Sequence, residues 1–217
     1  EKQPERLPAI WYGQAEINAR LGRSADALNL LQRLAEQYPH DSLVADSWFL
    51  SGDLLSKDGK YQEARAAYQN ALTAHPEGNF ALATQGRLGD CSYELYAQHR
   101  REDDLKQARL YYDTILENAE LPPAMQAQTL YKLGRTLEAA KDAAGALDVY
   151  NRLLYQAAEQ AAAGRIPGEV WVARGGYAAI KLCLSLNQPD AARRALAITP
   201  SQSKAGPGST LLVWMWK

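Results

Sequence analysis

The chain has 217 residues, of which 47% are hydrophobic and 23% charged, and its 24 Lys+Arg nearly balance its 25 Asp+Glu. This composition supports a packed core and excludes a disordered chain. With a net charge of -1 and no Lys/Arg-rich run, the chain offers little attraction for phosphate backbones, so we expect no nucleic-acid partner. No apolar run reaches the roughly 18–20 residues that span a bilayer, so we expect no membrane-spanning segment.

Residue usage predicts an all-α fold. The chain contains 37 Ala and 30 Leu against 5 Val and 6 Ile. Good helix formers therefore far outnumber the β-branched residues that favour strands.

A repeat of 37 residues organises the first part of the chain. Identical residues recur at this spacing in four pairs: Trp11 and Trp48, Gly22 and Gly59, Ala27 and Ala64, Pro39 and Pro76. Each unit is expected to form a helix, a short turn at Gly, a second helix and a stop at Pro, with apolar residues three and four apart. One such hairpin cannot bury its apolar faces alone, so several must stack.

The second unit carries the full pattern: Trp48, Gly52, Leu55, Gly59, Tyr61, Ala64, Tyr68, Ala71 and Pro76. This segment resembles the tetratricopeptide repeat. The resemblance implies a right-handed superhelical solenoid of about five helical hairpins. We further expect Gly52, Gly89 and Gly134 to lie where the two helices of a hairpin touch, because a small residue permits close approach.

Extending the register divides the chain into one solenoid, residues 1–199, and a linker with an apolar tail, residues 200–217. The expected repeats span residues 8–41, 45–78, 82–122, 127–164 and 168–198. Repeat three carries seven extra residues, with its turn expected at Arg100 to Asp104. We expect the tail from Leu211 to Trp216 to dock on the last hairpin or on a neighbouring copy, with Trp214 or Trp216 buried.

The sequence offers no convergent set of catalytic or metal-binding groups. His40, His75 and His99 fall at expected helix ends or in the insertion, and no motif for nucleotide, metal or nucleophile chemistry occurs. Cys91 and Cys183 fall at apolar positions of helices, which favours buried, unreactive thiols. We therefore expect no enzyme, no cofactor and no metal.

The family resemblance implies that function resides in a concave groove lined by the first helices. Carrying over repeat positions five and nine gives the candidate peptide-binding residues: Tyr12, Glu16, Phe49, Asp53, Asp90, Tyr131, Arg135, Tyr177 and Lys181. The aromatic residues at position five either pack between helices or form a ladder for an extended peptide. The charges at position nine are acidic in three repeats and basic in two, and either are ordinary surface charges or orient a peptide.

The sequence thus predicts a non-catalytic scaffold that binds a protein or peptide. The alternative is an architectural or self-associating segment of a longer solenoid, with contacts through its C-terminal face or tail. The segment Tyr38 to Ser42 before Trp48 is similar to the repeats common in bacterial cell-envelope proteins, which suggests the periplasm or envelope and leaves the cytoplasm open.

Overall fold

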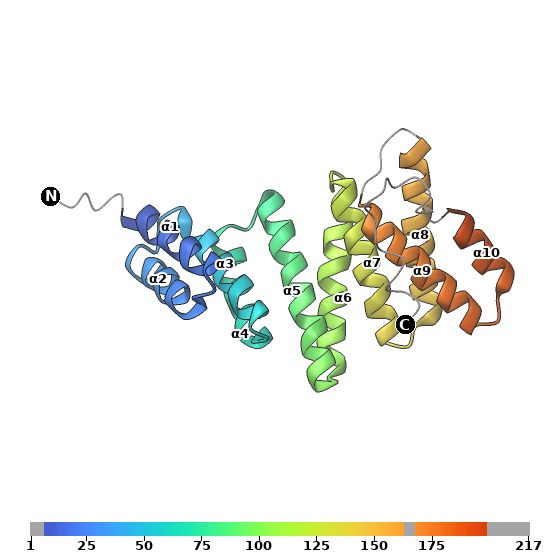
Figure 1. Ribbon diagram of the computed structural model, residues 1–217, viewed down its shortest axis with the longest axis horizontal. Coiled ribbons are helices and arrows are strands. Elements are labelled where there is room, and N and C mark those ends of the chain that lie inside the picture. The colour runs from blue at the N-terminus through green and yellow to red at the C-terminus, as the bar shows by residue number, and fades with distance from the viewer. Residues whose placement is uncertain (1–6, 163–167, 199–217) are drawn as a thin grey trace. The chain divides into compact units, whose positions relative to one another are not determined.

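The computed structural model describes residues 7–162 and 168–198. Every regular element in these ranges is an α-helix, which confirms the all-α prediction (Figure 1). The helices are α1 Leu7–Arg20, α2 Ser24–Gln37, α3 Leu43–Lys57, α4 Tyr61–Ala74, α5 Gly78–His99, α6 Glu102–Leu116, α7 Pro123–Ala139, α8 Ala143–Ala162, α9 Glu169–Ser185 and α10 Pro189–Ile198. The two helices of each repeat pair as an antiparallel hairpin, as the repeat predicts: α1 with α2, α3 with α4, α5 with α6, α7 with α8 and α9 with α10.

The turns inside the hairpins use the left-handed backbone conformation. Gly22 and Gly59 both have φ 75°, a region that glycine enters without steric cost. In the last three hairpins the same place is held by Arg100, Lys141 and Asn187, with φ between 56° and 62°. Arg100 and Lys141 therefore carry a strain of roughly 1–2 kcal/mol that the glycines avoid, whereas Asn187 enters this region more readily than other side chains.

The insertion in repeat three lengthens its first helix. Helix α5 has 22 residues where α3 has 15, while α6 with 15 residues nearly matches α4 with 14. The turn is shorter than the predicted Arg100 to Asp104, because Glu102 already begins α6. Acidic residues are favoured at the positive end of a helix, and three of them form this first turn.

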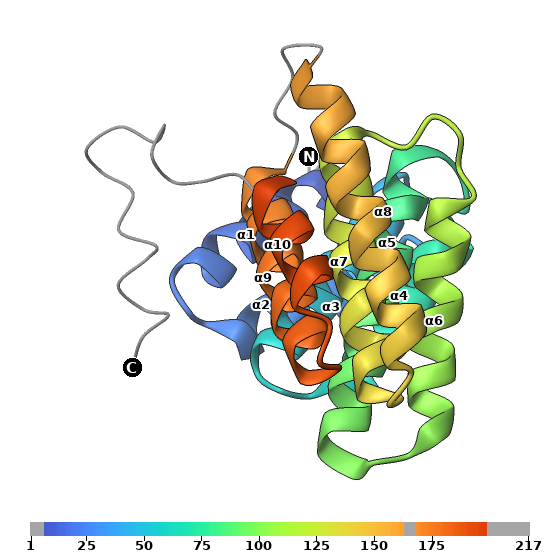
Figure 2. The same cartoon turned by 90° about the vertical axis from the view of Figure 1, so that its right-hand side faces the viewer.

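The described contacts divide the chain into two compact units, Glu1–Asn118 and Ala119–Lys217, which we call unit 1 and unit 2. Within unit 1, α5 packs against both α4 and α6. Within unit 2, α9 contacts α7, α8 and α10 (Figure 2). A single solenoid through residue 199 stays a prediction, and the tail of residues 200–217 lies outside the described residues.

Buried tyrosines close three of the hairpins. Each lies on the second helix and faces a glycine of the first: Gly52 with Tyr68, Gly89 with Tyr112, and Gly134 with Tyr150. A Cβ atom built on Gly52 would lie only 2.5 Å from Tyr68 Cε1. The predicted positions of the three glycines are therefore confirmed, since any larger residue would meet the ring.

An ion pair joins repeats two and three inside unit 1. The carboxylate of Asp104 in α6 accepts hydrogen bonds from Arg65 of α4 at 3.3 Å and from Arg101 at 3.1 Å. Only 8% of the Asp104 side chain is exposed. Two guanidinium groups thus compensate one nearly buried carboxylate, a balance that burial of charge requires.

Candidate functional site

The acidic candidates of unit 1 are tied to the hairpin tyrosines. Tyr68 Oη donates a hydrogen bond to Asp53 Oδ1 at 2.6 Å, and Tyr112 Oη donates one to Asp90 Oδ1 at 2.8 Å. Burial, reinforced by the neighbouring carboxylate, raises the pKa of both phenols well above the ordinary value. The phenols therefore stay protonated and hold these two carboxylates at the edge of the core.

In repeat four the hairpin tyrosine also donates a hydrogen bond to a carboxylate, but this carboxylate lies at a different position of the repeat. Its ninth position is the exposed Arg135, and Tyr150 Oη instead donates to Glu138, about one helical turn further along α7. Arg135 Nη1 in turn donates to Tyr131 Oη at 3.3 Å. Sequence reasoning missed Glu138, because it considered only positions five and nine of the repeat, and position nine here is Arg135.

A cation shares the acidic positions of unit 1. Arg87 Nε of α5 donates to Asp53 Oδ1 at 2.9 Å. Burial alone would lower the pKa of Arg87, but Asp53 and then other neighbours, Asp90 among them, outweigh it and raise that pKa. Arg87 therefore partly neutralises the charge of Asp53 and Asp90, two of the three acidic residues at position nine. In the third, Glu16, the Oε1 atom lies 4.0 Å from Nη2 of the exposed Arg20.

The aromatic candidates divide into packed and exposed side chains. Phe49 is half-buried, with its ring centroid 5.6 Å from that of Tyr68 and 5.4 Å from that of Phe80. Tyr12 packs on the core of the first hairpin, and burial together with Asp46 and Glu16 raises its pKa. Tyr12 and Phe49 thus contribute to packing as well as to the first-helix surface.

In unit 2 one aromatic candidate, Tyr131, is half-buried and the other, Tyr177, is exposed. The ring centroid of Tyr131 lies 5.6 Å from that of Trp171 of α9, with the two rings tilted by 37°. Tyr177 of α9 is 48% exposed. The guanidinium of Arg174 lies 5.1 Å from the Trp171 ring centroid, within the range of a cation–π interaction.

One face of α9 forms an exposed stripe of apolar and basic side chains, which we call the α9 stripe: Val170, Arg174, Tyr177, Lys181 and Leu184. Their spacing of three and four residues places them on one side of the helix. The opposite side is buried through Val172, Gly175, Ala179 and Cys183. The α9 stripe therefore contains both candidates from repeat five, Tyr177 and Lys181, with exposed side chains.

Comparison with known proteins identifies the repeats. A family model described as a tetratricopeptide repeat-like domain matches residues 13–93, and one described as a tetratricopeptide repeat matches residues 128–159. The chain is a tetratricopeptide repeat protein. Among curated proteins, none matches the sequence significantly.

Solved structures share the fold of these tetratricopeptide repeats at low sequence identity. A MamA protein superposes with a TM-score of 0.68 at 11% identity, over 90% of this chain and 91% of that one. YrrB, described as a tetratricopeptide repeat protein with an unusual peptide-binding site, gives a TM-score of 0.61 at 16% identity over 87% and 82%. The repeats of a putative kinesin light chain from Podosopora anserina give 0.65 at 15% over 92% and 95%.

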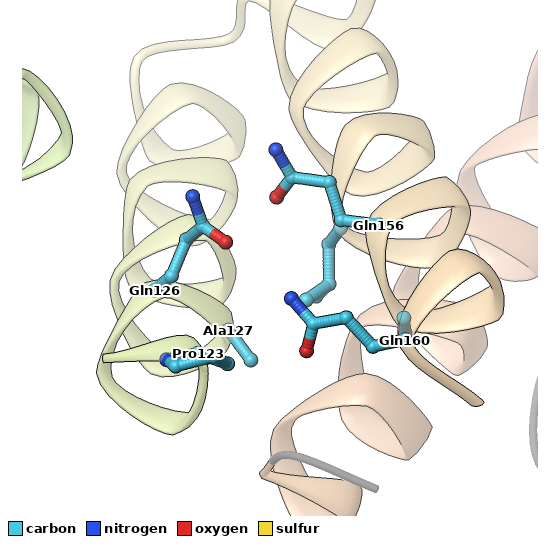
Figure 3. Close-up of a pocket in the computed structure, with 7 residues that line it drawn as sticks. Pro123, Gln126, Ala127, Gln156 and Gln160 are labelled. Carbon is cyan, nitrogen blue, oxygen red and sulfur yellow. The ribbon is translucent and has the colours of Figure 1, made fainter. Parts of the chain in front are cut away.

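A small pocket lies inside the fourth tetratricopeptide repeat, between α7 and α8. Figure 3 shows Gln126 of α7 and Gln156 and Gln160 of α8 around it. Its volume of ≈ 10 Å³ suits about one water molecule, which could bond the buried amide oxygens of Gln156 and Gln160. The pocket is too small for a ligand.

The described residues show no group of three or more His, Cys, Asp or Glu placed to hold a metal. Cys91 and Cys183 are free and buried, as predicted. Burial raises the pKa of the Cys91 thiol to about 12, which disfavours the reactive thiolate. Among the helices described, none combines the length and apolar character needed to cross a membrane.

Proposed function

We propose that this tetratricopeptide repeat protein is a non-catalytic scaffold that binds a protein or peptide on the faces of its first helices. The α9 stripe is the observation that carries the proposal. Tyr177, 48% exposed, lies between the exposed cations Arg174 and Lys181, and Val170 at 45% and Leu184 at 59% exposure lie at the two ends of the stripe. Large apolar side chains gathered on one exposed face are typical of an interaction surface.

The composition of the stripe favours a partner with apolar and acidic side chains. Tyr and Arg are enriched among residues that dominate binding energy, because each combines a large contact area with polar groups. Arg174 is already oriented by Trp171, so less conformational entropy is lost when a carboxylate binds it. The peptide-binding site named for YrrB, a protein of similar fold, is consistent with this proposal.

The test selects ligands from a displayed library of random peptides with the full chain as bait. The affinity of each selected peptide is then measured by fluorescence anisotropy against the wild type, Tyr177→Ser and Lys181→Glu. We expect each variant to weaken binding about tenfold or more. Tyr155→Ser is the matched control, because Tyr155 is 57% exposed on α8, a second helix.

Two outcomes would contradict the proposal. The first is a selection that yields no saturable binder. The second is a set of peptides that bind Tyr177→Ser and Lys181→Glu as tightly as the wild type. Circular dichroism checks that each variant keeps its helices, which the exposed positions of both residues lead us to expect.

A second function, self-association or stacking on further repeats, is favoured by the outer side of α1. Ile10 and Ile17 are 50% and 59% exposed, and Leu21 just beyond the helix is 61% exposed. Their spacing of seven and four residues forms an apolar row. If this row mediates self-association, light scattering should show a concentration-dependent mass that Ile17→Lys lowers. Leu110→Lys, at an equally exposed site on α6, should not lower it.

A further inference from the structure

A hollow of ≈ 510 Å³ opens between the loops of repeats one and two in unit 1. We call it the loop hollow. It is formed by two segments that are far apart in sequence, residues 39–46 before and within the start of α3, and residues 74–80 between α4 and α5. Its volume falls in the range of roughly 300–1,000 Å³ typical of sites for small ligands or single side chains.

The walls of the loop hollow combine an apolar lining with a polar rim. The apolar part consists of Pro39, Val44, Ala45, Ala74 and Phe80. The polar part consists of His40, Asp41, Ser42, Asp46 and His75. Neither Lys nor Arg occurs among these lining residues. The hollow thus brings together two histidines that the sequence had placed only as separate loop residues.

The electrostatics of the loop hollow favour a cation. Helices α2 and α4 end beside it and α3 and α5 begin beside it, so two negative and two positive helix ends largely cancel. The carboxylates of Asp41 and Asp46 therefore dominate the charge, and Asp41 Oδ1 also accepts a hydrogen bond from the amide of Leu43 at 2.9 Å.

The loop hollow is continuous with the first-helix surface of unit 1. Asp46 lines the hollow and also acts on Tyr12 of α1, whose pKa it helps to raise. Phe80 also lines the hollow, and its ring centroid lies 5.3 Å from that of His75 and 5.4 Å from that of Phe49. A peptide on the faces of α1 and α3 would therefore pass beside the opening.

We infer that the loop hollow is an anchor site for a basic side chain, arginine or lysine, of a bound peptide. The apolar wall matches the aliphatic stem of such a residue, and Asp46 and Asp41 match its charged end. Phe80 and His75 add aromatic surface against which a guanidinium group can lie. This inference rests on the proposed peptide-binding function and specifies the chemistry of the ligand at unit 1.

The test uses the full chain and a small probe, N-acetyl-L-arginine methylamide, followed by NMR titration of the ring signals of His40, His75 and Phe80. The matched probe is N-acetyl-L-citrulline methylamide, which has nearly the same shape without the charge. We expect saturable shifts with the arginine probe and about fivefold or more weaker binding of the citrulline probe. Added salt should weaken the binding of the arginine probe and leave the binding of the uncharged citrulline probe unchanged.

Variants locate the site. Asp46→Asn should lower the affinity of the protein for the arginine probe about fivefold. Asp58→Asn, which changes an exposed carboxylate in the α3–α4 turn outside the lining, should leave it unchanged. Equal binding of the two probes, stronger shifts with N-acetyl-L-glutamate methylamide, or no effect of Asp46→Asn would overturn the inference. The comparison of probes uses the wild-type protein, so it holds even if a variant is destabilised.

The outcome is separable from that of the proposed function. If selected peptides still lose affinity on Tyr177→Ser but the arginine probe does not bind, only the anchor site is wrong. If the probe binds the loop hollow but no peptide is selected, the scaffold proposal is wrong and the hollow is a cation site without a peptide partner.

Discussion

Replacing Gly52 by alanine tests the packing that defines these hairpins. The added Cβ would lie 2.5 Å from Tyr68 Cε1 and 2.7 Å from Cδ1 and Cζ. A relaxed carbon–carbon contact is about 3.5–4.0 Å, so the ring or the helix must move by about 1 Å. Tyr68 has no exposed surface and its hydroxyl is held by Asp53 at 2.6 Å, so the ring has no free direction in which to move.

Two opposing effects set the size of the change. Overpacking a core costs about 1–3 kcal/mol. Replacing a glycine by alanine in a helix interior stabilises the folded state by about 0.5–1 kcal/mol. Because the ring is held on all sides, we expect the packing cost to dominate and Gly52→Ala to destabilise unit 1 by about 1–2 kcal/mol.

The assay is urea unfolding followed by circular dichroism, with amide hydrogen exchange to localise the effect to α3 and α4. Gly13→Ala in α1 is the matched control, because a Cβ there meets nothing within 4 Å. The control should be stabilised by up to about 1 kcal/mol. If Gly52→Ala gained stability as Gly13→Ala does, the close packing of Tyr68 on Gly52 would be refuted.

A double variant sharpens this test, because the chain contains its own alternative pair. In the first hairpin, Ala15 and Leu31 occupy the places of Gly52 and Tyr68, and both are buried in one cluster. Gly52→Ala combined with Tyr68→Leu should therefore be less destabilised than the sum of the two single changes, by about 1 kcal/mol or more.

Three further predictions concern buried polar groups. Alkaline pH should destabilise the fold, because unfolded tyrosines ionise near pH 10 whereas burial raises the folded pKa of three of them: Tyr68, Tyr112 and Tyr150. Stability should be constant below pH 10 and fall above it by up to about 1.4 kcal/mol per pH unit for each tyrosine, and a Tyr→Phe change should reduce that slope in urea titrations. Asp104→Ala should cost about 1–3 kcal/mol in urea unfolding, because it removes the shared partner of Arg65 and Arg101, and Asp103→Ala on the exposed side of the same turn should cost little. Cys91 should react with a thiol reagent only after unfolding, since its pKa is about 12, and rapid labelling of the native protein would contradict its burial.

The helices and hairpins could be predicted from the sequence because their signals are local. Gly22 and Gly59 mark turns, and Pro39 and Pro76 follow the ends of second helices. The register also placed Gly52 correctly against the second helix. The turn predicted from Arg100 to Asp104 is too long, because α6 already begins at Glu102. Acidic residues favour a helix start as much as a loop, so the sequence did not separate the two.

The partners of the candidate residues could not be predicted in the same way. Arg87 and Asp53 lie 34 positions apart and meet only when neighbouring first helices pack. Position nine in repeat four holds Arg135, so repeat register gave no reason to consider Glu138. The loop hollow depends on two loops from successive repeats, and no spacing within either loop indicates that His40 and His75 share it.

The division into two units affects how a ligand of this protein can be found. Contacts concentrate within Glu1–Asn118 and within Ala119–Lys217, and each helix packs mainly on its neighbours in sequence. In such repeat arrays stability is approximately a sum of local terms, and a ligand stabilises the part that binds it. Slowed amide exchange restricted to α3–α5 or to α7–α9 would therefore map an unknown partner before any contact residue is identified.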